Sequence, residues 1–147
     1  MRDELYTILN APRETENEIR EVTDQIYTLM WSTVPGAIRY DVPRVQTSPE
    51  DRMAETFGVV DELRNRLLWL CKRKRREEDT IRRIIMGCVD LDPDERKVLR
   101  GRYLDREPWA QIAGWVNATD RRVYQIHRSA CDKLEAFLWP TGNKMQT

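Results

Sequence analysis

The sequence predicts an all-α protein, and two observations carry this prediction. Glycine is scarce, with six residues in a chain of 147. Apolar residues recur at steps of three and four nearly everywhere, which is the spacing of one helix face, whereas a half-buried strand alternates apolar and polar residues. At this length the chain fits one domain, or one compact domain with a helical extension.

The first apolar stripe indicates a helix between Glu14 and Val34. Its members are spaced by three and four residues: Ile19, Val22, Ile26 and Leu29. Pro35-Gly36 should end this helix, and the segment to Asp51 carries Pro43 and Pro49 without an apolar period, so a loop is expected there. Ser48, followed by Pro49 and two acidic residues, is a good N-cap for the next helix.

A longer stripe follows and repeats about every 3.5 residues, the signature of a helix that packs along another helix. It comprises Met53, Phe57, Val60, Leu63, Leu67 and Leu70. The stripe fails at residues 72–79 and resumes at Ile81, so one long charged helix and two shorter helices both fit. The predicted helical hairpin can form inside one chain or by dimerisation, and the sequence favours neither.

Three short helices are expected in the last third of the chain. Asp92 is placed to cap the first, with Pro93 in the first helical position. Pro108 opens the second, Asn117 suits the tight turn after it, and Thr119 caps the third, which runs to about Leu138. The side chains expected to point inward are Val98, Leu99, Tyr103, Leu104, Trp109, Ile112, Ala113, Val116, Val123, Ile126, Ala130, Leu134 and either Phe137 or Leu138.

The last two of these helices have the spacing of a helix-turn-helix motif. Two helices that cross steeply need a small residue at the crossing, here Ala113, and a turn four residues later, here Asn117. Val123 and Ile126, ten and thirteen residues after Ala113, return apolar groups to the same core. The spacing therefore predicts a DNA-binding motif in which Asn stands where Gly is common.

Residues 91–138 resemble region 4 of bacterial sigma factors. The residues that carry the resemblance are Glu95, Arg102-Tyr103, Ile112-Ala113, Thr119, Arg122-Val123, Gln125-Ile126, Ala130 and Lys133-Leu134. The chain is more similar still to phage-encoded late-gene regulators of the ArpU type, which share the N-terminal helix, an element like Val45 to Pro49 and a long charged helix. This resemblance implies DNA binding in the control of phage or prophage late genes.

The outward face of the last helix contains the candidate DNA contacts. With its apolar stripe inward, this helix presents Asp120, Arg121, Arg122, Tyr124, Gln125 and Arg128. Arg pairs with guanine and Gln with adenine in the major groove, and Tyr contacts a thymine methyl or a phosphate. In the sigma pattern the base-reading positions fall at Asp120, Arg121, Tyr124 and Gln125, where Asp120 and Tyr124 depart from the common Arg. His127, between this face and the core, suits a structural or phosphate-contacting role.

Charge is distributed unevenly although the formal net charge is zero. Residues 96–128 hold eight basic and three acidic side chains, an excess of five positive charges that suits a DNA-binding segment. A second basic run, Lys72 to Arg76, is followed at once by three acidic residues, so a solvated helix face is favoured over a DNA contact.

Several classes of protein are disfavoured by what the sequence lacks. Cys71, Cys88 and Cys131 have no CxxC spacing and accompany a single histidine, so neither a metal site nor a disulfide framework is expected. Nucleotide-binding loops and the common catalytic motifs are missing, so we expect no enzyme, no catalytic residues and no cofactor. No segment resembles a signal peptide or membrane helix, so a cytoplasmic location is expected.

The sequence thus predicts a helical hairpin over 1–90 that can oligomerise, a DNA-binding domain over 91–139 and a flexible tail over 140–147. The favoured function is a transcription regulator that binds double-stranded DNA as a dimer, joined by the stripe over 53–70 or by the first helix. The alternatives are a phage small terminase subunit and a module that contacts RNA polymerase without gripping DNA. No sigma region 2 is recognisable, which disfavours a complete sigma subunit.

Overall fold

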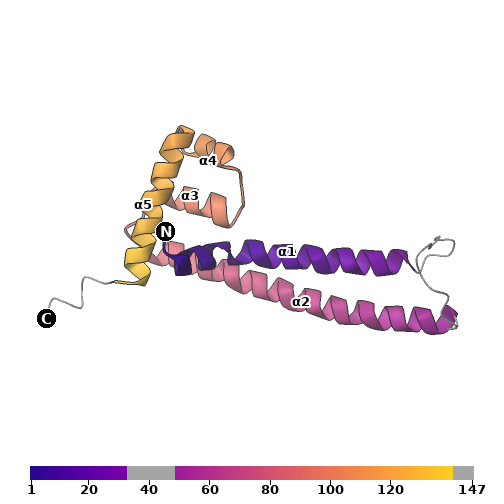
Figure 1. Cartoon of the computed structure of the whole chain (residues 1–147). Helices are drawn as coiled ribbons and strands as arrows, with labels where there is room; N and C mark the ends of the chain where they lie inside the picture. Colours follow the sequence, from indigo (N-terminus) through magenta and orange to yellow (C-terminus); the bar gives the residue numbers. More distant parts are fainter. Residues whose placement is uncertain (33–48, 141–147) are drawn as a thin grey trace. The chain divides into compact units, whose positions relative to one another are not determined.

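A computed structural model describes residues 1–32 and 49–140, and over these residues the chain is all-α, as predicted (Figure 1). The helices are α1 (Asp3–Trp31), α2 (Pro49–Gly87), α3 (Pro93–Tyr103), α4 (Trp109–Trp115) and α5 (Asp120–Leu138). The predicted stop at Pro35-Gly36, the loop after it, the cap at Ser48 and the tail over 141–147 lie outside the described residues.

Helix α1 begins at Asp3, well before the segment from Glu14 for which the sequence predicted a helix. Pro12 lies inside it and has no N–H to donate to the carbonyl of Ile8, so local propensity disfavours a helix here. Leu5 and Leu9 are fully buried, and this packing offsets the loss at Pro12. The early turns of α1 therefore depend on tertiary contacts, which explains why the sequence pattern missed them.

Helix α2 is one uninterrupted helix of 39 residues, which decides between the two possibilities that the sequence left open. Its charged middle stays helical with the help of ion pairs one turn apart. Glu78 bridges Lys74 (3.8 Å) and Arg82 (3.6 Å). In the basic run before it, Arg75 and Arg76 are exposed.

The chain forms two compact units. The hairpin unit, residues 15–73, pairs the later part of α1 with the first part of α2. Val22, Val60 and Leu70 are buried in it, and Arg73 Nη1 lies 3.6 Å from Glu18 Oε2. A hairpin therefore forms within a single chain.

The prediction that the whole stripe over 53–70 packs along another helix is wrong for Met53 and Phe57. They are 44% and 50% exposed. Both helices rise about 1.5 Å per residue, so the Glu18–Arg73 ion pair places the end of α1, Trp31, near the level of Val60. Met53 and Phe57 therefore lie beyond the reach of α1.

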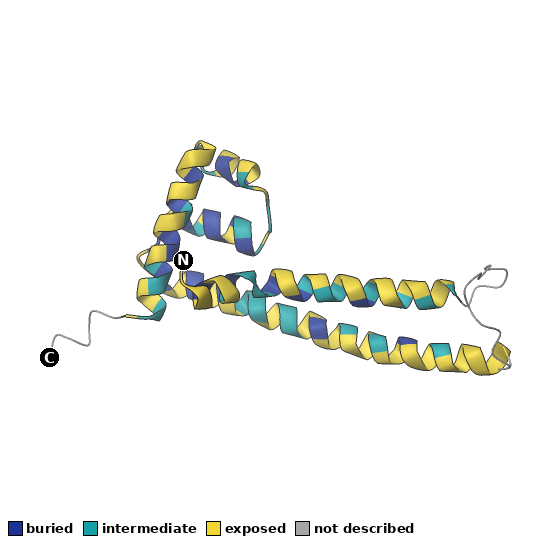
Figure 2. Cartoon of the chain, in the orientation of Figure 1, coloured by how far each residue is buried: buried dark blue, intermediate teal, exposed yellow. Residues whose placement is uncertain are grey.

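The C-terminal unit combines residues 1–14 with 74–147. Its larger core joins Leu5 and Leu9 of α1, Ile81, Ile84 and Ile85 of α2, Leu99 of α3 and Leu134 of α5. The Arg2 guanidinium also lies 4.6 Å from the centre of the Trp139 ring, which fixes the start of α1 near the end of α5. Figure 2 shows buried residues on the face of α5 that meets α3 and α4.

Candidate nucleic-acid interface

The start of α3 is fixed by a polar clamp that reaches across to α5. Asp92 is the N-cap, Pro93 follows it, and the Asp92 backbone N–H donates to Glu95 Oε1 (3.0 Å). Lys133 of α5 donates to the same oxygen at 2.6 Å. Glu95 is only 3% exposed, so this single buried carboxylate links the helix cap of α3 to α5.

The protonation state of Glu95 follows from these contacts. Burial raises the pKa of a carboxyl group, but the hydrogen bonds from Lys133 and from the Asp92 backbone outweigh burial and hold the Glu95 pKa below its ordinary value. The Lys133 pKa is correspondingly raised, chiefly by its hydrogen bond to Glu95. The pair is therefore charged at neutral pH.

The turn between α4 and α5 has the geometry that the spacing predicted. Asn117 adopts a positive φ of 52°, a left-handed conformation that Asn tolerates better than most residues. The Ala118 N–H donates to the Ala113 carbonyl (3.0 Å), and the Thr119 side chain accepts from the Arg122 N–H (3.2 Å). The turn therefore ends α4 and caps α5 within a few residues.

A small core holds α3, α4 and α5 together. It consists of Val98, Ile112, Ala113, Val123 and Ile126, with Trp109, Val116 and Ala118 packed against it. All of these except Ala118 were predicted to point inward. At the end of α5 Leu138 joins the larger core while Phe137 is 46% exposed, which decides between the two.

Gly101 is a residue of this site that the sequence analysis missed. A Cβ atom at this position would lie 2.9 Å from Cζ3 of Trp115 and 3.0 Å from Cγ1 of Ile112. Helix α4 therefore approaches α3 closely at a residue with no side chain. The sequence signal that could have revealed Gly101 is a lone glycine inside a helical pattern. Such a glycine lowers helix stability, so its presence indicates a position where close packing leaves no room for a side chain.

Aromatic side chains pack against the α5 residues that were predicted to contact DNA. The centre of the Trp109 ring lies 5.1 Å from that of Tyr124 and 5.0 Å from that of His127. The Arg102 guanidinium carbon lies 4.6 Å from the centre of the Trp109 ring. Tyr124 is nevertheless 51% exposed. Trp109 thus holds one side of the Tyr124 ring while leaving the rest accessible.

His127 is held by this cluster and by the larger core. Its Nε2 atom lies 2.6 Å from the Tyr103 hydroxyl and 3.5 Å from Cys131 Sγ. Burial, then the charge of Arg102 and that of the N-terminus, lower the His127 pKa below its ordinary value. Burial also raises the pKa of Tyr103 and that of Cys131, the latter to about 12. His127 is therefore neutral at pH 7, as a packed structural residue.

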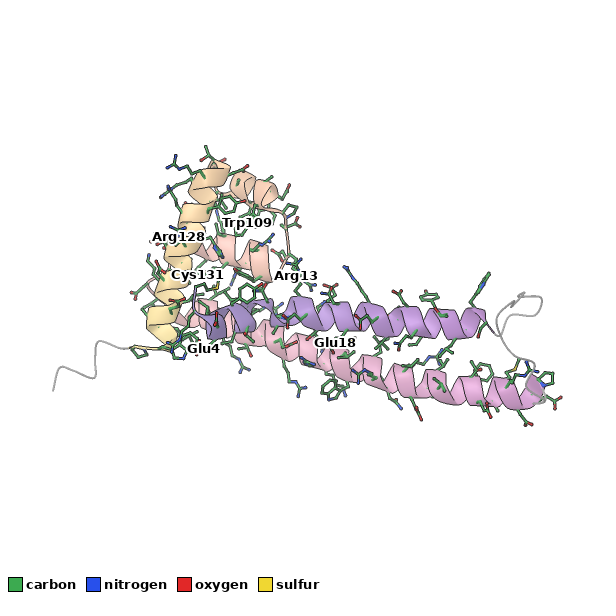
Figure 3. All side chains as sticks on the ribbon, in the orientation of Figure 1. Glu4, Arg13, Glu18, Trp109, Arg128 and Cys131 are labelled. Carbon is green, nitrogen blue, oxygen red and sulfur yellow. The ribbon has the colours of Figure 1, made fainter. Side chains whose placement is uncertain are left out.

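All six predicted contact residues are exposed on α5: Asp120, Arg121, Arg122, Tyr124, Gln125 and Arg128. Arg122 Nη1 donates to Gln125 Oε1 (3.4 Å), so these two side chains share one patch. Figure 3 shows Arg128 and Trp109 on opposite sides of α5. The helix thus separates an apolar face, which packs on α3 and α4, from a polar face that carries three arginines.

A groove of about 350 Å³ borders this polar face, between the start of α3 and α5. One wall carries carboxylates at Asp92, Asp94 and Glu95, and the other carries Arg122 and Gln125. The groove therefore has walls of mixed charge.

The C-terminal helices match a known family model. The family model described as Sigma-70, region 4 matches residues 89–136, which include α3, α4 and most of α5. This segment is therefore similar to a sigma region 4 helix-turn-helix. Neither the curated proteins nor the solved structures contain a match to the chain.

Two features are absent from the described residues, 1–32 and 49–140. None of their helices is long and apolar enough to cross a membrane. They also contain no group of three or more His, Cys, Asp or Glu side chains placed to hold a metal ion.

Proposed function

We propose that this chain is a sequence-specific DNA-binding regulator of transcription and that α5 is its recognition helix. The observation that carries the proposal is the division of α5 into two faces within the segment that matches Sigma-70 region 4. Val123 and Ile126 are buried on one face, and the polar residues are exposed on the other. A helix of this kind, following a tight turn, enters the major groove of DNA in helix-turn-helix proteins.

The exposed residues have different roles in this proposal. Arg121 and Gln125 lie one turn apart and read base edges, because their side chains match guanine and adenine. Arg122 and Arg128 contact phosphates, which positions the helix without reading sequence. Asp120 and Tyr124 stand at the other base-reading positions, and Tyr124 is held in place by Trp109.

The biological setting and the partners are part of the same proposal. The resemblance of most of the chain to ArpU-type proteins supports control of phage or prophage late genes. The likeness to sigma region 4 supports contact with RNA polymerase. A single helix-turn-helix makes a small footprint, so we propose that two copies bind neighbouring half-sites as a homodimer.

Selection of bound fragments from genomic and random DNA, followed by sequencing, tests the proposal. One recurring motif upstream of genes, with affinity that falls steeply with salt, is the expected result. Arg122→Ala and Arg128→Ala should each weaken all sequences alike and reduce the salt slope by about one. Arg75→Ala removes an exposed arginine of α2 and should leave both quantities unchanged.

The other functions predict different results. Recovery of a packaging-start site by a ring of eight or more subunits would identify a terminase subunit. Binding to RNA polymerase without salt-dependent DNA affinity would identify an interaction module, and either result would overturn the proposal.

A further inference from the structure

One face of α2 in the hairpin unit remains exposed although it carries large apolar side chains. Phe57, Asp61, Arg64 and Leu68 follow one another at steps of four, three and four residues, so they form a single stripe along the helix. Phe57 is 50% and Leu68 61% exposed, and Asp61 and Arg64 are exposed between them. Among the described residues, neither Asp61 nor Arg64 has an ion-pair partner.

The order of side chains along this stripe is self-complementary. From Phe57 to Leu68 the side chains are apolar, acidic, basic and apolar. An antiparallel second copy of the stripe therefore places an acidic side chain opposite a basic one and an apolar side chain opposite an apolar one. The other charged residues of this part of α2 are arranged in the same way, with mainly acidic residues before the centre of the stripe and basic residues after it. Residues 50–62 contain five acidic side chains and one basic side chain, whereas residues 64–73 contain four basic side chains and none that is acidic.

We infer that this stripe is the surface on which a second copy of the chain docks, with the two α2 helices antiparallel. A two-fold axis between Asp61 and Arg64 then places Phe57 against Leu68 of the partner, and Asp61 against the partner's Arg64. Each contact occurs twice, as an isologous interface requires. A parallel pairing would instead place each charged half against its like, which is unfavourable.

This inference deepens the homodimer of the proposed function and commits it to one surface. The buried stripe of α2, which includes Val60 and Leu70, already packs inside the hairpin unit. The docking stripe lies to one side of it, so a dimer leaves the hairpin intact. The association belongs to the hairpin unit and can be measured without DNA.

A charge swap tests the pairing. The full chain should sediment as a dimer at tens of micromolar without DNA. Asp61→Arg and Arg64→Asp should each weaken dimerisation at least tenfold, because each creates two like-charge contacts. The double variant Asp61→Arg/Arg64→Asp should restore it, with helix content by circular dichroism unchanged throughout. A monomeric wild type, or a double variant as weak as the single ones, would overturn the inference.

Disulfide cross-linking tests the direction. Cys71 is exposed, whereas Cys88 and Cys131 are buried. In the antiparallel pair residue 53 lies beside the partner's residue 71, while the two copies of Cys71 are about 26 Å apart along the axis, at 1.5 Å per residue. Met53→Cys should therefore give a covalent dimer under mild oxidation, and wild type should not.

Glu55→Cys is the matched control, because residue 55 lies at nearly the same level but about 200° around the helix from residue 53. It should remain uncross-linked. Cross-linking of wild type through Cys71, or equal cross-linking of both variants, would contradict an antiparallel pair. A monomer that binds its DNA site would refute this interface and the homodimer but leave the DNA-binding function standing, and a dimer without specific DNA affinity would refute the DNA-binding function alone.

Discussion

The Tyr103 hydroxyl oxygen lies 2.6 Å from Nε2 of His127, and this contact ties α3 to the candidate recognition helix. Because its pKa is raised, the Tyr103 hydroxyl keeps its proton at neutral pH. It can therefore donate a hydrogen bond to Nε2 of a neutral His127 imidazole. Protonation of His127 removes this acceptor in a partly buried place. The contact therefore makes the fold sensitive to pH.

We expect the melting temperature to fall as pH decreases below 6.5. The His127 pKa is lowered in the folded state, so the unfolded chain binds a proton first and stability is lost as pH falls from 6.5 toward the folded pKa. One proton accounts for at most about 1.4 kcal/mol per pH unit. His127→Gln should flatten this dependence, since the chain has one histidine. An unchanged pH dependence in this variant would exclude His127 as the cause.

Gly101→Ala should destabilise the protein by about 1–3 kcal/mol, because the new methyl group meets Ile112 and Trp115 at the α3–α4 contact. Gly114→Ala is its control. Nothing lies within 4 Å of a Cβ there, so the substitution should stabilise α4 by about 0.5–1 kcal/mol. Denaturant unfolding of both variants measures the difference, and equal effects would argue against a close contact at Gly101.

Lys133→Met should lower stability at pH 7 and make the protein more sensitive to acid. Without Lys133 the buried carboxylate of Glu95 loses its cation, so its pKa rises. Stability that depends on ionised Glu95 is then lost at a higher pH. An acid titration followed by circular dichroism should show a raised midpoint, whereas Lys97→Met, at an exposed lysine of α3, should not move it.

The two faces of α5 should respond differently to substitution. Arg121→Ala and Gln125→Ala should leave melting nearly unchanged but weaken specific binding by about 1–3 kcal/mol and relax discrimination at one base position. Val123→Asp should unfold the motif, because Val123 is fully buried between its helices. Unchanged affinity in both alanine variants, with a normally folded Val123→Asp, would show that the faces are assigned wrongly.

Much of the C-terminal helical arrangement could be predicted from the sequence because its signals are local. Asp92 and Thr119 cap the helices that they were expected to cap, and Asn117 has the left-handed conformation that the turn needs. The buried face of α5 follows from a period of 3.6 residues, which also exposes the six candidate contact residues. Their binding to DNA stays a prediction.

Only the tertiary structure shows which segments from distant parts of the sequence pack against these helices. Leu5 and Leu9 pack in the core beside Leu134, although a proline follows them and no local pattern marks the contact. The second partner of Glu95, Lys133, lies 38 residues away, and the need for Gly101 appears only where α4 crosses α3. Caps, turns and helix faces depend on residues within about one turn, so sequence determines them. Which faces meet depends on the energy of packing between segments far apart in the chain, and that is set only by the folded arrangement.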